Sequence, residues 1–291
     1  MVARDVHVIV TTMRVAHQVV RALGRALLPE SESQRLARLQ IRDAGHGYDL
    51  FGMHPDWIAL ACGLGRPFYR GYFRVSSHGF EHLPARGAAI LVANHAGTLP
   101  IDGAMLCMDV LEHTDPPRMP RAVADRFIPE LPFVSASMSR VGVVSGTLGN
   151  VRRLLEASEL CLIFPEGTAA IGKPYRDRYE LREWHVGHAE LALRYGVPVI
   201  PVAIIGSEEQ WPQIGRLPVG GVFGMPYVPV PLTPLPLPVR YRILYGEPLQ
   251  LAGPPCPAPS ADAVAQAADV TRAALSALIT RGLAERRGIF R

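Results

Sequence analysis

Cysteine is scarce in this sequence, and its few copies are scattered. Four cysteines occur, at positions 62, 107, 161 and 256, and no two of them form a Cys-x-x-Cys pair. Such pairs are typical of zinc sites and redox motifs, while disulfide frameworks belong mainly to short secreted chains. We therefore expect reduced thiols and predict neither a disulfide framework nor a metal site.

Charged residues are also few, at 19% of the 291 residues, whereas hydrophobic residues make up 48%. This balance excludes a disordered chain. The net charge of +4 comes mainly from arginines spread over the whole length. No basic run is interleaved with aromatic residues, as a nucleic-acid platform requires, so we expect no nucleic-acid partner. An anionic lipid surface would suit the basic excess, although ordinary solvation explains it better on charge alone.

The sequence has no apolar run that is suited to cross a membrane as a regular helix. The longest uncharged stretch, residues 217–239, contains seven prolines, and proline interrupts helices. The proline-rich stretch at 212–238 is expected to be either an apolar lining beside the site or a membrane-facing loop. Residues 8–13 are too few for a leader peptide, and Arg14 follows them. We predict a peripheral or monotopic protein on the cytoplasmic face of a membrane, with the lipid surface as its partner.

The signatures of several enzyme classes are missing as well. There is no Gly-x-Ser-x-Gly nucleophile elbow, which argues against a serine hydrolase. There is also neither a GxxxxGK[ST] phosphate loop nor a GxGxxG motif after a strand. The chemistry has to come from other residues.

Two segments near the N-terminus have the pattern of interfacial helices. In residues 13–27, apolar residues recur at helical spacing and arginines form part of the opposite stripe. Residues 57–73 combine aromatic rings with flanking arginines, and both kinds of side chain settle at headgroup depth. Packing against the protein's own core explains each segment about equally well.

From residue 88 onward, apolar strand patterns alternate with helical ones. Strands are predicted at 88–93, 160–164, 199–205 and 239–245, and helices at 103–111, 150–157, 183–195 and 262–283. This alternation predicts an α/β fold, with a mostly parallel sheet flanked by helices. In such folds the functional residues collect at the carboxyl ends of the strands.

The first candidate site follows the strand at 88–93. Asn94 and His95 leave this strand, and Asp102 comes after a turn that contains glycine and proline. An imidazole can accept a proton from a hydroxyl group while a carboxylate fixes its tautomer. We interpret His95 as a general base and Asp102 as its partner, although a lone His–Asp pair is more often structural.

The second candidate site is the sequence Phe-Pro-Glu-Gly-Thr at 164–168, which ends another strand. A glycine after a strand lets backbone N–H groups approach an anion, and Thr168 adds a hydroxyl donor. Four cations follow in one loop: Lys173, Arg176, Arg178 and Arg182. Arginine is the stronger phosphate ligand because its guanidinium binds in a bidentate way. For this segment alone, a plain turn with solvated arginines explains the pattern better.

The third segment is Gly-Val-Pro-Val-Ile-Pro-Val at 196–202, which begins a buried strand with two prolines. Proline has no backbone donor, so this strand is expected at an edge or entry of the sheet. We predict that Val199, Ile200 and Pro201 form an apolar wall suited to an acyl chain.

In this order, the three segments resemble the lysophospholipid and glycerol-phosphate acyltransferase family. The family's blocks are Asn-His followed by Asp, Phe-Pro-Glu-Gly-Thr, and a Val-Pro-Ile-Pro-like strand. The stretches at 79–84 and 246–249 are similar to the family's flanking sequences, so the resemblance covers about residues 75–250. It implies that His95 and Asp102 are catalytic. The substrate-binding residues that we predict are Asn94, Glu166, Gly167, Thr168, Arg176, Arg178 and Arg182.

The resemblance also implies a reaction, the transfer of a fatty-acyl group from acyl-CoA or acyl-carrier protein to a lysophospholipid such as 1-acylglycerol-3-phosphate. His95 would remove the hydroxyl proton as the oxygen attacks the thioester. Backbone donors near Gly97 or Gly167 would hold the oxyanion. Apart from the acyl donor as co-substrate, no cofactor is expected. The implied domains are N-terminal interfacial helices at 1–74, a catalytic domain at 75–250, and a C-terminal linker and helix at 251–291.

The sequence departs from the family pattern in two places. Six residues separate His95 from Asp102, where the family has four, and the stretch 142–147 lacks the arginine expected for an acceptor phosphate. The Pro-Ile-Asp ending of the first block looks more like the monoacylglycerol acyltransferase branch. Two alternatives therefore stay open. One is a neutral acceptor, such as mono- or diacylglycerol or a long-chain alcohol, and the other is a lipid-binding protein without turnover.

Overall fold

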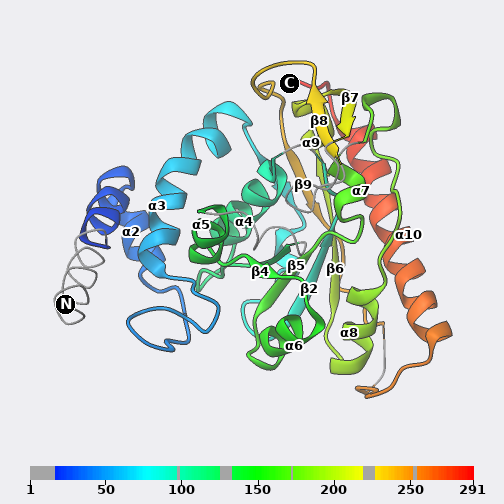
Figure 1. Ribbon diagram of the computed structural model, residues 1–291, viewed down its shortest axis with the longest axis horizontal. Helices are drawn as coiled ribbons and strands as arrows, with labels where there is room; N and C mark the ends of the chain where they lie inside the picture. Colours follow the sequence, from blue (N-terminus) through cyan, green and yellow to red (C-terminus); the bar gives the residue numbers. More distant parts are fainter. Residues whose placement is uncertain (1–16, 97–98, 125–132, 172, 219–226, 252–253) are drawn as a thin grey trace.

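A seven-stranded sheet forms the centre of the chain (Figure 1). The computed structural model describes residues 17–96, 99–124, 133–171, 173–218, 227–251 and 254–291. Within these residues the strand order of the sheet is β1-β9-β6-β2-β5-β3-β4, and β7 and β8 form a separate hairpin. The strands are β1 Ser76–His78, β2 Ala89–Ala93, β3 Arg121–Ala124, β4 Val144–Ser145, β5 Leu160–Ile163, β6 Val199–Ile205, β7 Gln213–Pro218, β8 Tyr227–Pro231 and β9 Arg242–Tyr245.

Five neighbouring strands of this sheet, from β6 to β4, run parallel. Only β9 and β1, which pair with each other, run the opposite way. The prediction of an α/β fold with a mostly parallel sheet is therefore confirmed. Because β2, β5 and β6 are parallel neighbours, the segments that follow them meet at one edge of the sheet. The first two sequence motifs lie in the segments that follow β2 and β5, whereas the third, at 196–202, lies at the amino end of β6.

The strand β6 lies inside the sheet, so the expectation of an edge strand was wrong. It pairs with β2 on one side and with β9 on the other. The β9 ladder begins at Val202, opposite Tyr245, and just beyond it Gly246 donates its N–H to the carbonyl of Pro201 (2.8 Å). The missing N–H of Pro201 thus falls at the end of the β9 ladder, where proline is tolerated.

Helices cover both faces of the sheet. The longer helices are α2 Glu30–Leu36, α3 Pro55–Arg66, α4 Ile101–His113, α5 Val134–Arg140, α6 Leu148–Glu156, α8 Gly187–Tyr195 and α10 Ala261–Glu285. The shorter ones are η1 Pro67–Tyr72, η2 Phe80–His82, α7 Thr168–Ile171, η4 Tyr175–Asp177 and α9 Ser207–Gln210. Side chains alternate along β2, so Leu91 packs in the cluster with α4 and η1, and Ile90 packs with α6 and α8. Figure 1 shows α10 beside β6. The predicted domain boundaries stay predictions.

The N-terminal helices bury one face and expose another. Residues 17–27 are helical, and Val20 and Leu28 are buried. Val19, Leu23 and Leu27 are exposed. The predicted apolar stripe is therefore divided between the protein core and the solvent, and its members at positions 13 and 16 lie outside the described residues. None of the helices in the described ranges has both the length and the hydropathy of a bilayer span.

A buried carboxylate that the sequence analysis did not identify joins η1 to the sheet. Asp109 of α4 accepts hydrogen bonds from the hydroxyl groups of Tyr69 (2.5 Å), Tyr245 (2.7 Å) and Ser77. Burial, together with this carboxylate, raises the pKa of both tyrosines well above its usual value. Both therefore remain neutral donors, and η1 is fixed over α4.

Candidate active site

His95 and Asp102 meet beyond the carboxyl end of β2. Asp102 lies in the first turn of α4, and its Oδ2 is 2.8 Å from Nδ1 of His95. The side chain of Asp102 is 0% exposed and that of His95 is 13% exposed. The same carboxylate accepts the backbone N–H groups of Ala96 and Gly103, each at 2.8 Å. The carboxylate is thus fixed in place, and the imidazole remains partly accessible.

This geometry indicates which of the two ring nitrogens of His95 carries the proton. An ionised carboxylate only accepts hydrogen bonds, so Nδ1 carries the proton that it donates to Asp102, and Nε2 is the nitrogen that can accept a proton from a hydroxyl group. The ring of Phe164 lies 4.4 Å from the imidazole between centroids and restricts its rotation. The longer loop therefore does not separate His95 from Asp102, which was the premise of the alternative without turnover.

Asn94 and Glu166 hold backbone groups around the site in place. Both residues are fully buried. Glu166 accepts the backbone N–H groups of His95 (3.3 Å) and Arg182 (2.8 Å). The amide of Asn94 donates to the carbonyl of Ile204 (3.1 Å) and accepts its N–H (2.8 Å). These contacts position the backbone of the site, and the predicted role of both residues in substrate binding stays a prediction.

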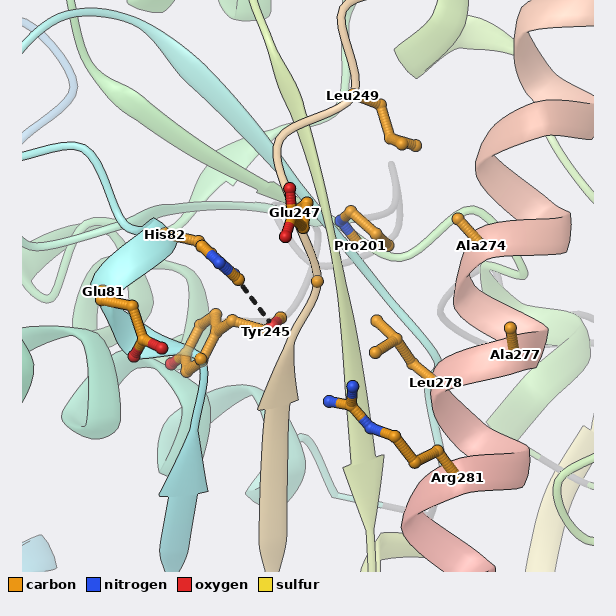
Figure 2. A pocket seen from close by; sticks show the side chains of 12 residues that line it. Glu81, His82, Pro201, Tyr245, Glu247, Leu249, Ala274, Ala277, Leu278 and Arg281 are labelled. Carbon is orange, nitrogen blue, oxygen red and sulfur yellow. Dashed lines mark hydrogen bonds between the residues drawn. The ribbon is translucent and has the colours of Figure 1, made fainter.

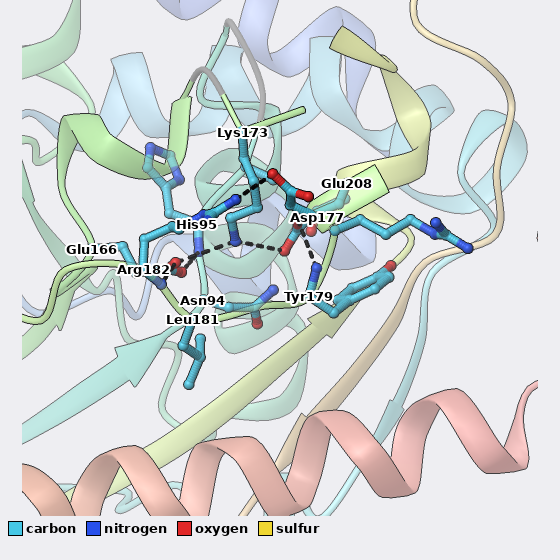
Figure 3. A network of polar contacts seen from close by, with 12 residues as sticks. Asn94, His95, Glu166, Lys173, Asp177, Tyr179, Leu181, Arg182 and Glu208 are labelled. Carbon is cyan, nitrogen blue, oxygen red and sulfur yellow. Dashed lines mark hydrogen bonds and ion pairs between the residues drawn. The ribbon is translucent and has the colours of Figure 1, made fainter. Parts of the chain in front are cut away.

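Lys173 is buried between two carboxylates (Figure 3). Its Nζ lies 3.2 Å from Oε2 of Glu166 and 3.3 Å from Oε1 of Glu208, at the start of α9. Burial raises the pKa of Glu208 to about 7, against the opposing effect of the Lys173 charge. From the sequence, Lys173 was predicted only as a weak phosphate ligand, and Glu208 was not identified. The burial of Lys173 argues against a direct contact with phosphate.

The three arginines predicted to bind the acceptor headgroup contact other protein groups. Arg176 is 85% exposed at its side chain and lies 3.5 Å from Asp177, and Arg182 pairs with the same carboxylate at 2.5 Å. The guanidinium of Arg178 lies over the ring of Tyr175, 4.6 Å from its centroid. Their role in substrate binding stays a prediction, and these contacts do not favour it.

Of the two predicted oxyanion donors, the structure describes only the one at Gly167. Gly97 lies outside the described residues. The N–H of Gly167 donates to the carbonyl of Phe164 at 3.0 Å, in a turn where Gly167 has a φ of 52°, so this N–H is already used within the protein. Thr168 begins α7, and its side chain lies outside the described residues. The binding roles of Gly167 and Thr168 stay predictions.

Two residues of the apolar wall that we predicted at 199–201 belong to the core of the sheet, and the role of this segment in acyl-chain binding stays a prediction. Val199 and Ile200 are fully buried in β6. A cavity of about 400 Å³ lies instead beside the first turn of α4, and its lining residues include Phe68, Tyr72, Ile101, Ala104, Met105 and Leu235. Ile101 and Ala104 belong to the same turn of α4 as Asp102, whereas neither His95 nor Asp102 is among the lining residues. Leu235 shows that the proline-rich stretch contributes to the apolar lining.

Pro201 lines a different cavity, of about 510 Å³, between the end of β9 and α10 (Figure 2). In the register of the sheet, Pro201 lies opposite Val92, before the carboxyl end of β2, and the chain beyond β9 runs towards the amino end of β6. His82 and Arg281 also line this cavity. It is therefore directed away from the edge of the sheet where His95 lies.

One group in the described part of the chain has the residue types of a metal site. Ligand atoms of His17, His54 and Asp56 all lie within 4.8 Å of one another. However, Oδ2 of Asp56 already pairs with His17 (3.2 Å) and with the guanidinium of Arg21 (3.0 Å). Because a guanidinium repels a metal cation, we interpret the group as an ion-pair cluster that joins the helix at 17–27 to α3.

Comparison with known proteins agrees with this geometry. A family model described as Acyltransferase matches residues 74–205. An uncharacterized protein of Mycobacterium tuberculosis is 36% identical over 263 residues, which cover 84% of this chain and 72% of the relative. An uncharacterized protein of Mycobacterium leprae is 37% identical over 212 residues, which cover 69% of this chain and 58% of the relative.

A solved structure has a similar fold. The crystal structure of the 1-acyl-sn-glycerophosphate (LPA) acyltransferase PlsC from Thermotoga maritima matches with a TM-score of 0.54. The match covers 80% of this chain and 83% of that chain, at 18% sequence identity. At this identity, the likeness shows the fold alone.

Proposed function

This chain belongs to the acyltransferase family, and on this premise we propose that it transfers a fatty-acyl group from an acyl thioester to the hydroxyl group of a glycerolipid. The observation that carries the proposal is the contact of 2.8 Å between His95 and the buried Asp102. An apolar pocket beside the turn that holds Asp102 supports it, because an acyl chain requires such a lining.

In the proposed mechanism, Nε2 of His95 removes the proton of the acceptor hydroxyl as its oxygen attacks the thioester carbonyl. A C–O bond forms and the C–S bond breaks, and the imidazolium returns its proton to the departing thiolate. Asp102 stabilises the imidazolium and holds its orientation. The sequence of steps is balanced without a covalent enzyme intermediate.

The first candidate acceptor is a lysophospholipid such as 1-acylglycerol-3-phosphate, as the family resemblance implies. The contacts of Arg176, Arg178 and Arg182 with other protein groups favour a second candidate, a neutral acceptor. Labelled acyl-CoA, and in parallel labelled acyl-carrier protein, should be offered with lysophosphatidate, monoacylglycerol, diacylglycerol and a long-chain alcohol, and the products separated by thin-layer chromatography. Product from lysophosphatidate alone supports the first candidate. The absence of product with every acceptor and both donors would refute the proposal.

The apolar pocket should set the preference for acyl-chain length. Ala104→Phe places an aromatic ring at the pocket, so part of a long chain has to remain in water. Each methylene excluded forfeits about 0.8 kcal/mol, or roughly fourfold in affinity. We expect kcat/KM for long-chain donors to fall, while that for short-chain donors stays unchanged. Ala104→Ser is the matched control. An equal loss with short and long chains would contradict the assignment of this pocket.

We further propose that the exposed face of the N-terminal helices lies on a lipid surface. Val19, Leu23 and Leu27 are 44–50% exposed, and Leu27 also lies against Gly63 of α3. Leu64 and Phe68 of the adjoining α3 and η1 are exposed too. Binding to anionic vesicles should exceed binding to neutral ones and should weaken with salt, because ions screen the attraction. The double variant Leu23→Glu/Leu27→Glu should reduce sedimentation with vesicles by about tenfold or more, since two leucines lose their apolar contact.

Leu50→Glu is the control for this experiment, since Leu50 is more exposed (66%) but lies in a turn outside these helices. It should bind vesicles as the wild type does. If the double variant binds vesicles as well as the wild type does, the exposed leucines do not contact lipid.

A further inference from the structure

We propose that Lys173 is a positioning residue for the general base. In this inference, which rests on the proposed function, its buried ammonium group holds the carboxylate of Glu166 against the backbone N–H of His95. Lys173 does not act on the substrate in this role. It acts through Glu166, and Glu208 anchors it to the segment that follows β6.

The contacts form a continuous path from α9 to His95 (Figure 3). Oε1 of Glu208 lies 3.3 Å from Nζ of Lys173, and Nζ lies 3.2 Å from Oε2 of Glu166. The other oxygen of Glu166, Oε1, accepts the N–H of His95 at 3.3 Å. The path joins the segments that follow β2, β5 and β6, which are far apart in the sequence.

The environment of Lys173 fits this role better than a role in binding a phosphate. Its side chain is 3% exposed, and those of Glu166 and Glu208 are 0% and 4% exposed. Within the described residues, Lys173 is the only cationic side chain in ion-pair distance of Glu166. A buried carboxylate without a cation is strongly disfavoured, so Lys173 is the cation that compensates Glu166 at this position.

The neighbouring charges have partners of their own. Glu209 accepts hydrogen bonds from the hydroxyl group of Tyr179 and from Arg286 (2.5 Å). The backbone N–H of Tyr179 donates to Glu208 at 2.9 Å. Because Arg286 forms its ion pair with Glu209, it does not replace Lys173 as the cation between Glu166 and Glu208.

The test compares Lys173→Met with the double variant Lys173→Met/Glu208→Gln. The single variant leaves two buried carboxylates facing each other and is expected to lose stability. The double variant removes the cation together with one of the two anions, which relieves the repulsion between the carboxylates. It is expected to fold, with lower stability than the wild type because Glu166 keeps no cation. A small misplacement of a catalytic group can reduce the rate by about 100-fold. For the double variant we expect kcat to fall about 10- to 100-fold, with KM for the acyl donor and acceptor within about twofold of the wild type.

Two further measurements make the outcome decisive. Hydrogen exchange at the His95 amide should be faster in the double variant than in the wild type. This measurement requires no turnover. It therefore tests the role of Lys173 even if the protein does not catalyse the proposed reaction. Arg152→Met, which removes a cation from the exposed Arg152–Glu156 pair on α6, is the matched control and should leave both readouts unchanged. A folded double variant with wild-type kcat and wild-type exchange would overturn the inference. So would a raised KM for the acceptor alone, or a double variant that does not fold.

Discussion

Replacing His95 with alanine is expected to lower kcat by about 10²- to 10⁴-fold, the usual contribution of a general base. The imidazole is partly exposed and contacts Asp102 and Phe164, so its removal leaves the core of the sheet intact. The free energy of unfolding should change by no more than about 1 kcal/mol. Initial rates with labelled acyl donor, together with chemical denaturation, measure the two quantities on the same preparation.

His82→Ala is the matched control for this substitution. His82 is also a half-buried histidine, but it lies in η2 beside the second cavity, away from the catalytic edge of the sheet. Its variant should keep the wild-type kcat. If His95→Ala folds and still turns over at the wild-type rate, His95 is not the general base.

Asp102→Asn is expected to have the second large effect, again about 10²- to 10⁴-fold in kcat. The carboxylate accepts three hydrogen bonds, from Nδ1 of His95 and from the backbone N–H groups of Ala96 and Gly103. An asparagine has only one acceptor oxygen, so its NH₂ group would face a donor. The imidazole then loses the partner that fixes its tautomer and stabilises its positive charge, as the logic of a catalytic triad requires.

Asp109→Asn separates catalysis from stability on the same helix. Asp109 is as fully buried as Asp102, but its partners are Tyr69, Tyr245 and Ser77. Its variant should lose roughly 1 to 3 kcal/mol of stability and keep kcat within a few-fold of the wild type. If Asp109→Asn loses as much kcat as Asp102→Asn, the effect of Asp102 is structural.

The sequence was most informative where local pattern and chemistry coincide. The apolar runs that became β2, β5 and β6 are buried on both faces, as strands of a parallel sheet require. The motifs at the carboxyl ends of β2 and β5 are then expected to meet, since parallel neighbours end at the same edge. His95 and Asp102 were identified because a base and its carboxylate are separated by a single loop.

The errors arose where the role of a side chain depends on distant segments. The motif at 164–168 indicated that Glu166 matters, but its contacts with His95, Arg182 and Lys173 exist only in the folded chain. The apolar run at 199–201 looks the same whether it lines a pocket or fills the core, because hydrophobicity does not indicate what a strand packs against. The pocket beside α4 combines Phe68, Ala104 and Leu235, and no local pattern connects these three.

The sequence by itself determined the family and the mostly parallel sheet, and it indicated His95 and Asp102 as the candidate pair, because these depend on residue type and on spacing along the chain. Only the tertiary structure decided that Glu166 serves the backbone of His95, that Lys173 is buried between two carboxylates, and that the three loop arginines contact other protein groups. Burial and charge compensation are properties of neighbours in space, and these neighbours come from segments that only the packing of the sheet brings together.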